Sequence, residues 1–209
     1  MLRRELEYFF GAVRFFTRLP VPGWVGHSTE ALNRSARYFP AVGLLVGGIG
    51  ALVFLGAMQL WPQPVAVLLS MAATIYATGA FHEDGLSDTV DGLGGGWDKL
   101  RILEIMKDSR VGSYGVVAMV LALLGKFTLL SSLDAALVPY ALLAGHALSR
   151  FCATVLLATM DYVREDLLSK AKPLATRLSP GEMLVALAFV LGAAGDAPSR
   201  WRPAFRRAK

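Results

Sequence analysis

Long runs of apolar residues restrict the fold of this chain more than any other feature. Residues 40–60 contain no charged side chain and are about as long as the ~20 residues that a helix needs to cross a bilayer. Comparable runs cover residues 65–81, 111–133 and 136–160. Backbone polar groups in lipid must find partners within the protein, which favours helices. With 55% hydrophobic and 18% charged residues, we predict an all-α, polytopic transmembrane helical bundle.

The basic residues lie between these runs and predict how the chain is oriented. Six arginines precede the first run, and the loops 82–110 and 161–181 carry four Lys or Arg each. The connectors 61–64 and 134–135 carry none. By the positive-inside rule, the N-terminus and both loops are expected on the cytoplasmic side. The net charge of +5 is therefore better explained by membrane orientation than by nucleic-acid binding.

The two ends of the chain differ from the central runs. Residues 5–19 mix apolar and charged positions, which predicts an amphipathic N-terminal helix at the membrane interface, ended by prolines 20 and 22. We expect residues 1–195 to form one integral membrane domain with four or five apolar helices. The last apolar run, after Glu182, is only about thirteen residues long, which is short for a span. Residues 196–209 are expected to be a basic tail, disordered or non-native, at a truncated or altered C-terminus.

Three aspartates follow the second apolar run, in the segment FHEDGLSDTVDG (81–92). Asp84, Asp88 and Asp91 are spaced i, i+4 and i+7, so a helix places all three carboxylates on one face. Carboxylates held this close repel one another unless they are protonated or share a cation. At a membrane edge we expect a hard divalent ion such as Mg²⁺. The same segment offers further oxygen ligands: Glu83, Ser87 and Thr89.

A second acidic pair, Glu104 and Asp108, lies in LEIMKDSRVGSYG (103–115), again four residues apart. Asp108 precedes Ser109 and Arg110. A carboxylate of the kind that binds metal ions therefore lies beside a guanidinium of the kind that binds phosphate. Two acidic helical faces would hold one or two Mg²⁺ ions against a pyrophosphate and neutralise charge on a leaving phosphate. The plainer interpretation is a cytoplasmic loop with solvated carboxylates. The second pair and the membrane edge favour the functional interpretation.

Two cations fall inside expected spans. Arg150 lies ten residues from the cytoplasmic end of its run, or about 15 Å deep at a helical rise of ~1.5 Å per residue. A cation at that depth normally faces a polar interior or an anion, and His146 lies one turn before it. We therefore favour Arg150 as a ligand of substrate phosphate over two structural roles, which are snorkelling to the membrane surface and an intramembrane ion pair. Lys126 is the second case, with neither interpretation favoured. His82 is a candidate base or metal ligand, or a partner of Glu83 or Asp84.

Several segments together resemble the cobalamin synthase family, adenosylcobinamide-GDP ribazoletransferase. They are TRLPVP (17–22), YFPAVGLLVG (38–47), FHEDGLSDTVDG (81–92) and LEIMKDSRVGSYG (103–115). Lys126, Ser149-Arg150 and Tyr162-x-Arg164-Glu165 also resemble the family's pattern in order and spacing. Asp166-Leu167-Leu168 departs from the family's usual Gly-Leu-Gly, and a late Gly/Thr-Gly-Asp block is absent from these residues.

The resemblance implies a multi-pass enzyme of the bacterial inner membrane that uses Mg²⁺ in the last step of cobalamin nucleotide-loop assembly. The cobinamide-phosphate group of adenosylcobinamide-GDP passes to α-ribazole or its 5′-phosphate, and GMP departs. The resemblance implies that the principal metal ligands are Asp84, Asp88 and Asp91. It also implies that Asp108, with Glu104, binds a second ion or positions the attacking hydroxyl. The implied substrate-binding residues are His82, Ser109, Arg110, Lys126, Arg150 and Arg164. Membrane lipid is an expected partner, and nucleic acid is not. Whether the chain forms a homo-oligomer is left open.

Two other classes fit parts of the pattern. A CDP-alcohol phosphotransferase also uses aspartates and Mg²⁺ at the membrane edge, but its Ala-Arg step is replaced here by Leu86-Ser87. A divalent-cation or proton-coupled carrier would place its acids near the midplane of broken helices, often with internal repeats. The acids here follow a span in a charged loop, and the sequence carries no evident repeat.

Overall fold

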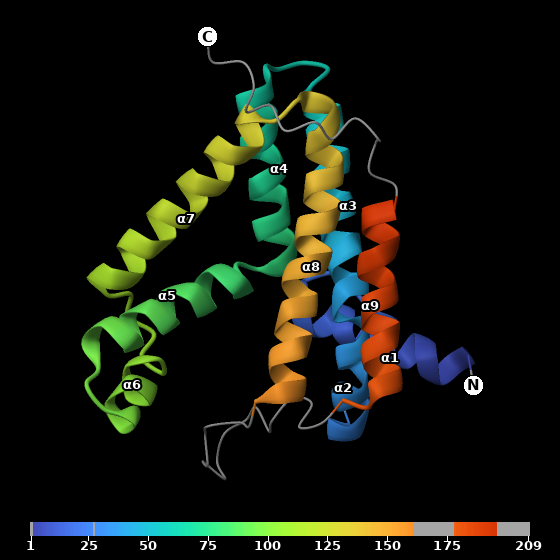
Figure 1. Ribbon diagram of the computed structural model, residues 1–209, viewed down its shortest axis with the longest axis vertical. Helices are drawn as coiled ribbons and strands as arrows, with labels where there is room; N and C mark the ends of the chain where they lie inside the picture. Colours follow the sequence, from blue (N-terminus) through green and yellow to red (C-terminus); the bar gives the residue numbers. More distant parts are fainter. Residues whose placement is uncertain (1, 27, 161–177, 196–209) are drawn as a thin grey trace.

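The computed structural model describes residues 2–26, 28–160 and 178–195, and these ranges are helical with no strand. The predicted all-α class is confirmed. Figure 1 shows the arrangement, in which long helices run side by side and α5 turns away from them. The elements are α1 (Leu2–Phe16), α2 (Thr29–Ser35), η1 (Ala36–Tyr38), α3 (Phe39–Ala57), α4 (Gln63–Thr78), α5 (Phe81–Gly95), α6 (Lys99–Ile105), α7 (Ser113–Ser132), η2 (Ala135–Leu137), α8 (Val138–Thr159) and α9 (Pro180–Gly195).

The tightest helix pair is α3 against α8, and glycines make it possible. A Cβ placed on Gly43 would overlap the carbonyl oxygen of His146 and lie 2.7 Å from the Cα of Ala147. A Cβ on Gly47 would lie 2.7 Å from the carbonyl oxygen of Leu142. Small residues four apart let two backbones approach, as in other membrane bundles. The two backbones therefore touch directly along this seam.

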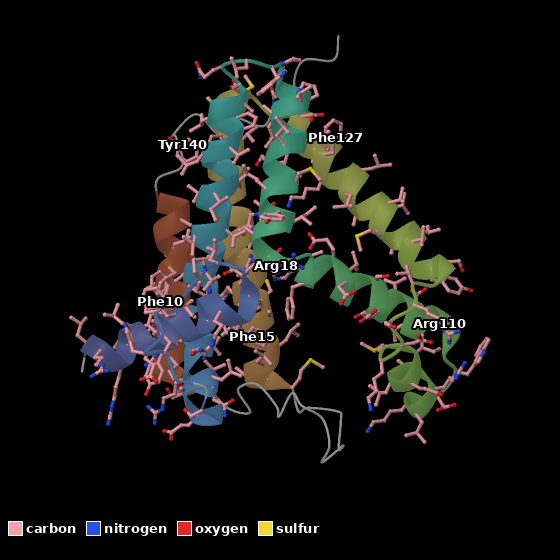
Figure 2. The ribbon with its side chains drawn as sticks, turned by 180° about the vertical axis from the view of Figure 1, so that it is seen from behind. Phe10, Phe15, Arg18, Arg110, Phe127 and Tyr140 are labelled. Atoms are coloured by element: carbon pink, nitrogen blue, oxygen red, sulfur yellow. The ribbon has the colours of Figure 1, made fainter. Side chains whose placement is uncertain are left out.

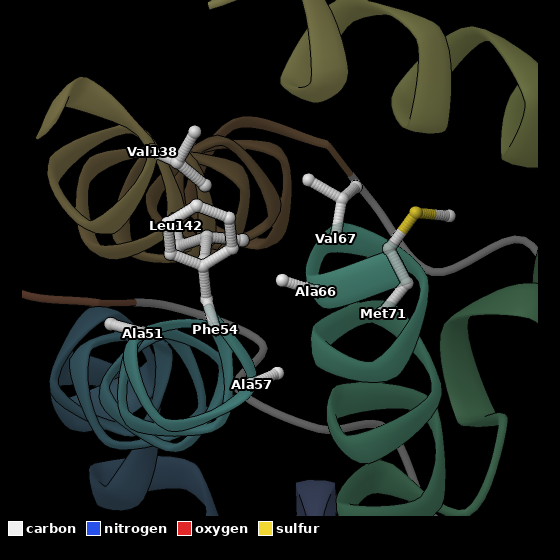
Figure 3. Packing of buried hydrophobic residues seen from close by; sticks show 8 residues of the cluster. All are labelled: Ala51, Phe54, Ala57, Ala66, Val67, Met71, Val138 and Leu142. Atoms are coloured by element: carbon white, nitrogen blue, oxygen red, sulfur yellow. The ribbon is translucent and has the colours of Figure 1, made fainter. Parts of the chain in front are cut away.

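A second layer of the core joins α3, α4 and α8. Phe54, Val67 and Val138 are fully buried, and Figure 3 shows them facing one another from the three helices. Phe127 and Leu130 of α7 pack against the edge of this cluster. The contact holds the end of α7 beside the bundle, whereas the rest of α7 diverges from α8 in Figure 1.

A sharp bend separates α4 from α5. Gly79 and Ala80 both adopt left-handed backbone conformations, with φ of 66° and 59°, and the axes of α4 and α5 meet at 85°. Glycine accepts this conformation without steric cost, whereas alanine does not. The bend corrects the expected span 65–81, because the helix ends at residue 78 and the acidic segment starts a new helix. The acidic loop is helical, as predicted.

Within the part of the chain that the structure describes, three helical segments are long and apolar enough to cross a membrane: Glu30–Ala57, Ser113–Ser132 and Ala135–Thr159. The bent pair α4 and α5 qualifies only when the two helices are taken together. Three of the four expected spans are thus matched directly, and the second only as a broken span. The apolar α9 is shorter and does not reach this length.

The N-terminal helix α1 forms as predicted and crosses the bundle in Figure 1. Its Ala12, Val13 and Phe16 are buried against residues of η1 and α3. Arg37 ties this end together, because it contacts Glu5 of α1 at 2.8 Å and Glu182 of α9 at 3.7 Å. The expected basic tail, residues 196–209, lies outside the described residues.

Candidate active site

The acidic helix α5 carries the three predicted aspartates in three environments. Asp84 is exposed, Asp88 is half-buried and Asp91 is buried. Residues 81–95 form a continuous helix, so the i, i+4, i+7 spacing does place the three on one face. The burial increases along the helix because its second half packs against the start of α7.

Asp91 binds the backbone at the beginning of α7. The amide N–H of Gly112 donates to one carboxylate oxygen at 2.7 Å, and that of Gly115 donates to the other at 2.8 Å. The first amides of a helix have no partner within it and carry partial positive charge, so a carboxylate there is favourable. A Cβ on Gly112 or Gly115 would overlap the Asp91 carboxylate. The glycines therefore admit Asp91 to this position.

The second acidic pair has cationic neighbours of its own. Arg110 donates to both oxygens of Asp108, with contacts of 3.0 and 2.6 Å. This guanidinium lowers the pKa of Asp108 to about 2. Glu104 accepts from Arg101 at 2.7 Å. These two ion pairs, Asp108 with Arg110 and Glu104 with Arg101, lie on the surface of α6 and the following turn. Figure 2 shows Arg110 at this edge of the molecule, away from Arg18.

The predicted five-carboxylate ligand set does not gather into one cluster. Among the residues that the structure describes, no three His, Cys, Asp or Glu side chains lie close enough to hold one ion. The physical reason is that Asp91 is held by α7, while Glu104 and Asp108 are held by arginines. Asp84 and Asp88 stay one turn apart on one face of α5. The assignment of metal ligands stays a prediction.

The predicted cations of the spans lie deeper in the bundle. Arg150 of α8 is 3% exposed, and its Nη1 donates to the carbonyl oxygen of His146 at 3.1 Å. Lys126 of α7 is half-buried and lines a groove between α7 and α8 together with His146 and Ser149. His82, at the start of α5, stacks on Phe16 with ring centroids 5.6 Å apart. Ser109 is exposed beside Arg110, and Arg164 lies outside the described residues.

Two features of this site were missed in the sequence. Phe16 was expected only as an apolar residue of the amphipathic helix, yet its ring contacts both His82 and the guanidinium of Arg150. Asp91 was expected only as a metal ligand, and the structure shows that its carboxylate accepts hydrogen bonds from two backbone amides. The sequence signal is the pair Gly112 and Gly115, three residues apart at the start of an apolar run. Such a helix start has room for a carboxylate from another helix.

Comparisons with known proteins agree on one family. The model of the cobalamin-5-phosphate synthase family matches residues 8–199. A protein of Shewanella woodyi named adenosylcobinamide-GDP ribazoletransferase is 50% identical over 191 residues, or 90% of this chain and 74% of that protein. Proteins of the same name from Shewanella amazonensis and Leptothrix cholodnii are 54% and 48% identical, over 87% and 90% of this chain and 71% and 72% of their own lengths. No solved structure matches.

Proposed function

The chain belongs to the cobalamin-5-phosphate synthase family, and we propose that it has adenosylcobinamide-GDP ribazoletransferase activity. It transfers the cobinamide-phosphate group of adenosylcobinamide-GDP to α-ribazole or its 5′-phosphate and releases GMP. The observation that carries this conclusion is the identity of about half the residues, over nine tenths of the chain, with relatives of that name. The reaction is a step of cobalamin biosynthesis.

We further propose that the reaction depends on Mg²⁺ held at the α5 face. Mg²⁺ is commonly bound through one or two carboxylates together with substrate phosphates, without a cage made only of protein ligands. Asp84 and Asp88, one helical turn apart, fit that smaller set. When bound, the ion would neutralise negative charge on the phosphate that departs with guanosine. Asp91, which binds the α7 amides, would fix the angle between α5 and α7 and thereby hold the face in place.

Arg110 and Asp108 fit a second part of the same site. Their mutual contacts hold the Asp108 carboxylate ionised and orient the exposed guanidinium. A guanidinium in this position binds phosphate oxygens well because its N–H groups form a planar fork. We propose that Arg110 contacts a substrate phosphate and that Asp108, with Glu104, positions the attacking hydroxyl or a second ion. Phosphoryl transfer needs mainly positioning and charge neutralisation, so a side-chain nucleophile is not required.

The proposed location is the bacterial inner membrane, with the N-terminus and the acidic helices on the cytoplasmic side. The Lys and Arg distribution supports this orientation, and the apolar α3, α7 and α8 support the membrane placement. Soluble nucleotides would then reach α5 and α6 directly. Assembly into a homo-oligomer is compatible with the apolar surface of α7 but is not required by the chemistry.

The activity is tested with the full chain in lipid nanodiscs, supplied with adenosylcobinamide-GDP, α-ribazole and Mg²⁺. We expect one GMP for each cobalamin formed, with loss of turnover in EDTA. Asp84→Asn should abolish turnover without changing membrane insertion or thermal stability. A folded chain that forms no GMP, but takes up metal into liposomes, would support the carrier alternative instead. Full activity of Asp84→Asn would remove the metal assignment.

A further inference from the structure

Four helices bring a group of side chains together around the start of α5, where Arg150 is buried and His82 is exposed. Phe16 of α1 lies under the guanidinium of Arg150, whose carbon is 5.6 Å from the ring centroid. The same ring stacks on His82, with the two planes 11° apart. We call this group the junction cluster, and it consists of Phe16, His82, Glu83, Lys126, His146 and Arg150. Its members come from four separate helices, α1, α5, α7 and α8.

The junction cluster carries an excess of positive charge. Glu83 is within electrostatic range of both Lys126 and Arg150, and it attracts each of them. The two cations in turn repel each other. The junction cluster thus contains two cationic side chains, Lys126 and Arg150, and one carboxylate, Glu83, before either histidine is counted. A low-dielectric interior makes such an excess costly, and a bound anion relieves it.

Several polar atoms of the junction cluster are buried without a hydrogen-bond partner. They are Oε2 of Glu83, Nε2 of His146 and Nε of Arg150. Arg150 is 3% exposed and is satisfied in part by the carbonyl oxygen of His146. An unpaired donor on a buried guanidinium costs free energy that a well-placed acceptor recovers. The unpaired Nε donor of Arg150 and the charge excess therefore both favour an anionic occupant, whereas Oε2 of Glu83 is an acceptor that an anion does not satisfy.

A groove between α7 and α8 borders the junction cluster at Lys126 and His146. The groove has a volume of about 470 Å³ and is lined at its polar part by Lys126, His146 and Ser149. Small residues such as Ala141 and Gly145 form its floor on α8. Pockets of ~300–1,000 Å³ are the usual size for small-molecule sites. A phosphate group with part of its ester can therefore be accommodated beside the cations.

We propose that the junction cluster is a phosphate-binding pocket in which Lys126 and Arg150 hold the anion and Glu83 is the internal counter-ion that the anion displaces. The pocket is separate from the aspartates of α5 and needs no metal ion. Its occupant is a phosphate ester, either of a soluble substrate or of an anionic lipid headgroup. Assigning it to the substrate rests on the proposed function, whereas the pocket itself does not.

The pocket is tested by binding, with the full chain in phosphatidylcholine nanodiscs and without Mg²⁺. Inorganic phosphate and GMP are titrated and followed by ³¹P NMR. We expect Arg150→Met and Lys126→Met each to weaken binding by about tenfold or more, since each removes a charged partner. Arg150→Lys should restore part of the affinity. Arg34→Met, an exposed cation of α2 paired with Glu30, is the matched control and should bind like the wild type.

Glu83→Gln gives a result that misfolding cannot imitate. Removing the competing carboxylate should tighten phosphate binding by roughly threefold or more, whereas damage to the fold would weaken it. Unchanged or weaker binding by Glu83→Gln would overturn the role of the counter-ion. Unchanged binding by both Arg150→Met and Lys126→Met would overturn the pocket, whether or not the chain turns over substrate.

The source of the phosphate is separated by lipid composition. In phosphatidylglycerol nanodiscs, a headgroup occupant would abolish phosphate binding, and native mass spectrometry would find retained lipid that Arg150→Met loses. A soluble substrate would bind equally in both lipids. A chain that binds neither phosphate nor lipid in a manner dependent on Arg150 contradicts the proposal. Phosphate binding without turnover would leave the pocket standing while the proposed activity fails.

Discussion

The carboxylate of Asp91 in α5 accepts a hydrogen bond of 2.7 Å from the backbone N–H of Gly112 at the beginning of α7. It also accepts a second hydrogen bond, from the N–H of Gly115. Among the described residues, no other buried carboxylate joins the acidic helix α5 to the apolar helix α7. The Asp91 carboxylate therefore ties the acidic helix α5 to the beginning of α7.

Asp91→Ala is expected to lower the free energy of unfolding by about 2 kcal/mol or more, because two buried amides lose a charged acceptor. Thermal unfolding in detergent measures the loss, and faster hydrogen exchange at Gly112 and Gly115 locates it. Asp84→Ala, at an exposed position of the same helix, is the control and should stay within about 0.5 kcal/mol of wild type. Equal stability of the two variants would contradict a structural role for Asp91.

Gly43→Ala should loosen the α3–α8 seam, since the added Cβ overlaps the carbonyl oxygen of His146. Overpacking of this kind costs about 1–3 kcal/mol, measured by thermal unfolding. Gly48→Ala is the matched control on the same helix, because open space surrounds its Cβ position. Helix propensity favours alanine at both positions, so equal destabilisation of Gly48→Ala would mean that an effect other than the seam, such as lipid contact, is responsible.

Asp88→Asn is expected to raise the Mg²⁺ concentration that gives half-maximal turnover by about tenfold or more, since one of two proposed carboxylate ligands is neutralised. Mn²⁺ binding followed by electron paramagnetic resonance measures the same change without turnover. Asp134→Asn, in the connector between α7 and α8, is the control. A Mg²⁺ dependence identical to wild type in Asp88→Asn would show that this residue is not a ligand.

The pair Asp108 and Arg110 predicts a pH response. The guanidinium lowers the pKa of Asp108 from 3.8 to about 2, so the carboxylate stays ionised throughout the neutral range. The contribution of this pair to stability is present above the unfolded value of 3.8 and is lost as pH falls through about 2. Arg110→Gln should return the pKa of Asp108 toward its usual value, as followed by NMR titration. An unchanged titration would mean that other groups cause the shift.

Much of the candidate site could be read from the sequence, but its connections could not. Asp84, Asp88, Lys126 and Arg150 were predicted as site residues from their type, spacing and depth, and these roles stay predictions. The sequence does not reveal that Asp91 would be taken by α7, because the two amides it binds lie beyond a separate short helix. Nor does it connect Phe16 with Arg150, which approach one another only after α1 crosses the bundle.

The amino-acid sequence by itself determined the class of fold and the location of its helices. Apolar runs of spanning length must satisfy their backbone hydrogen bonds internally, and this leaves the helix as the local solution. Tertiary structure alone decided which polar groups meet. Two left-handed residues at Gly79 and Ala80 turn α5 by 85° from α4. That change of direction brings Asp91 to the α7 amides, while Glu104 and Asp108 contact arginines in and just after α6.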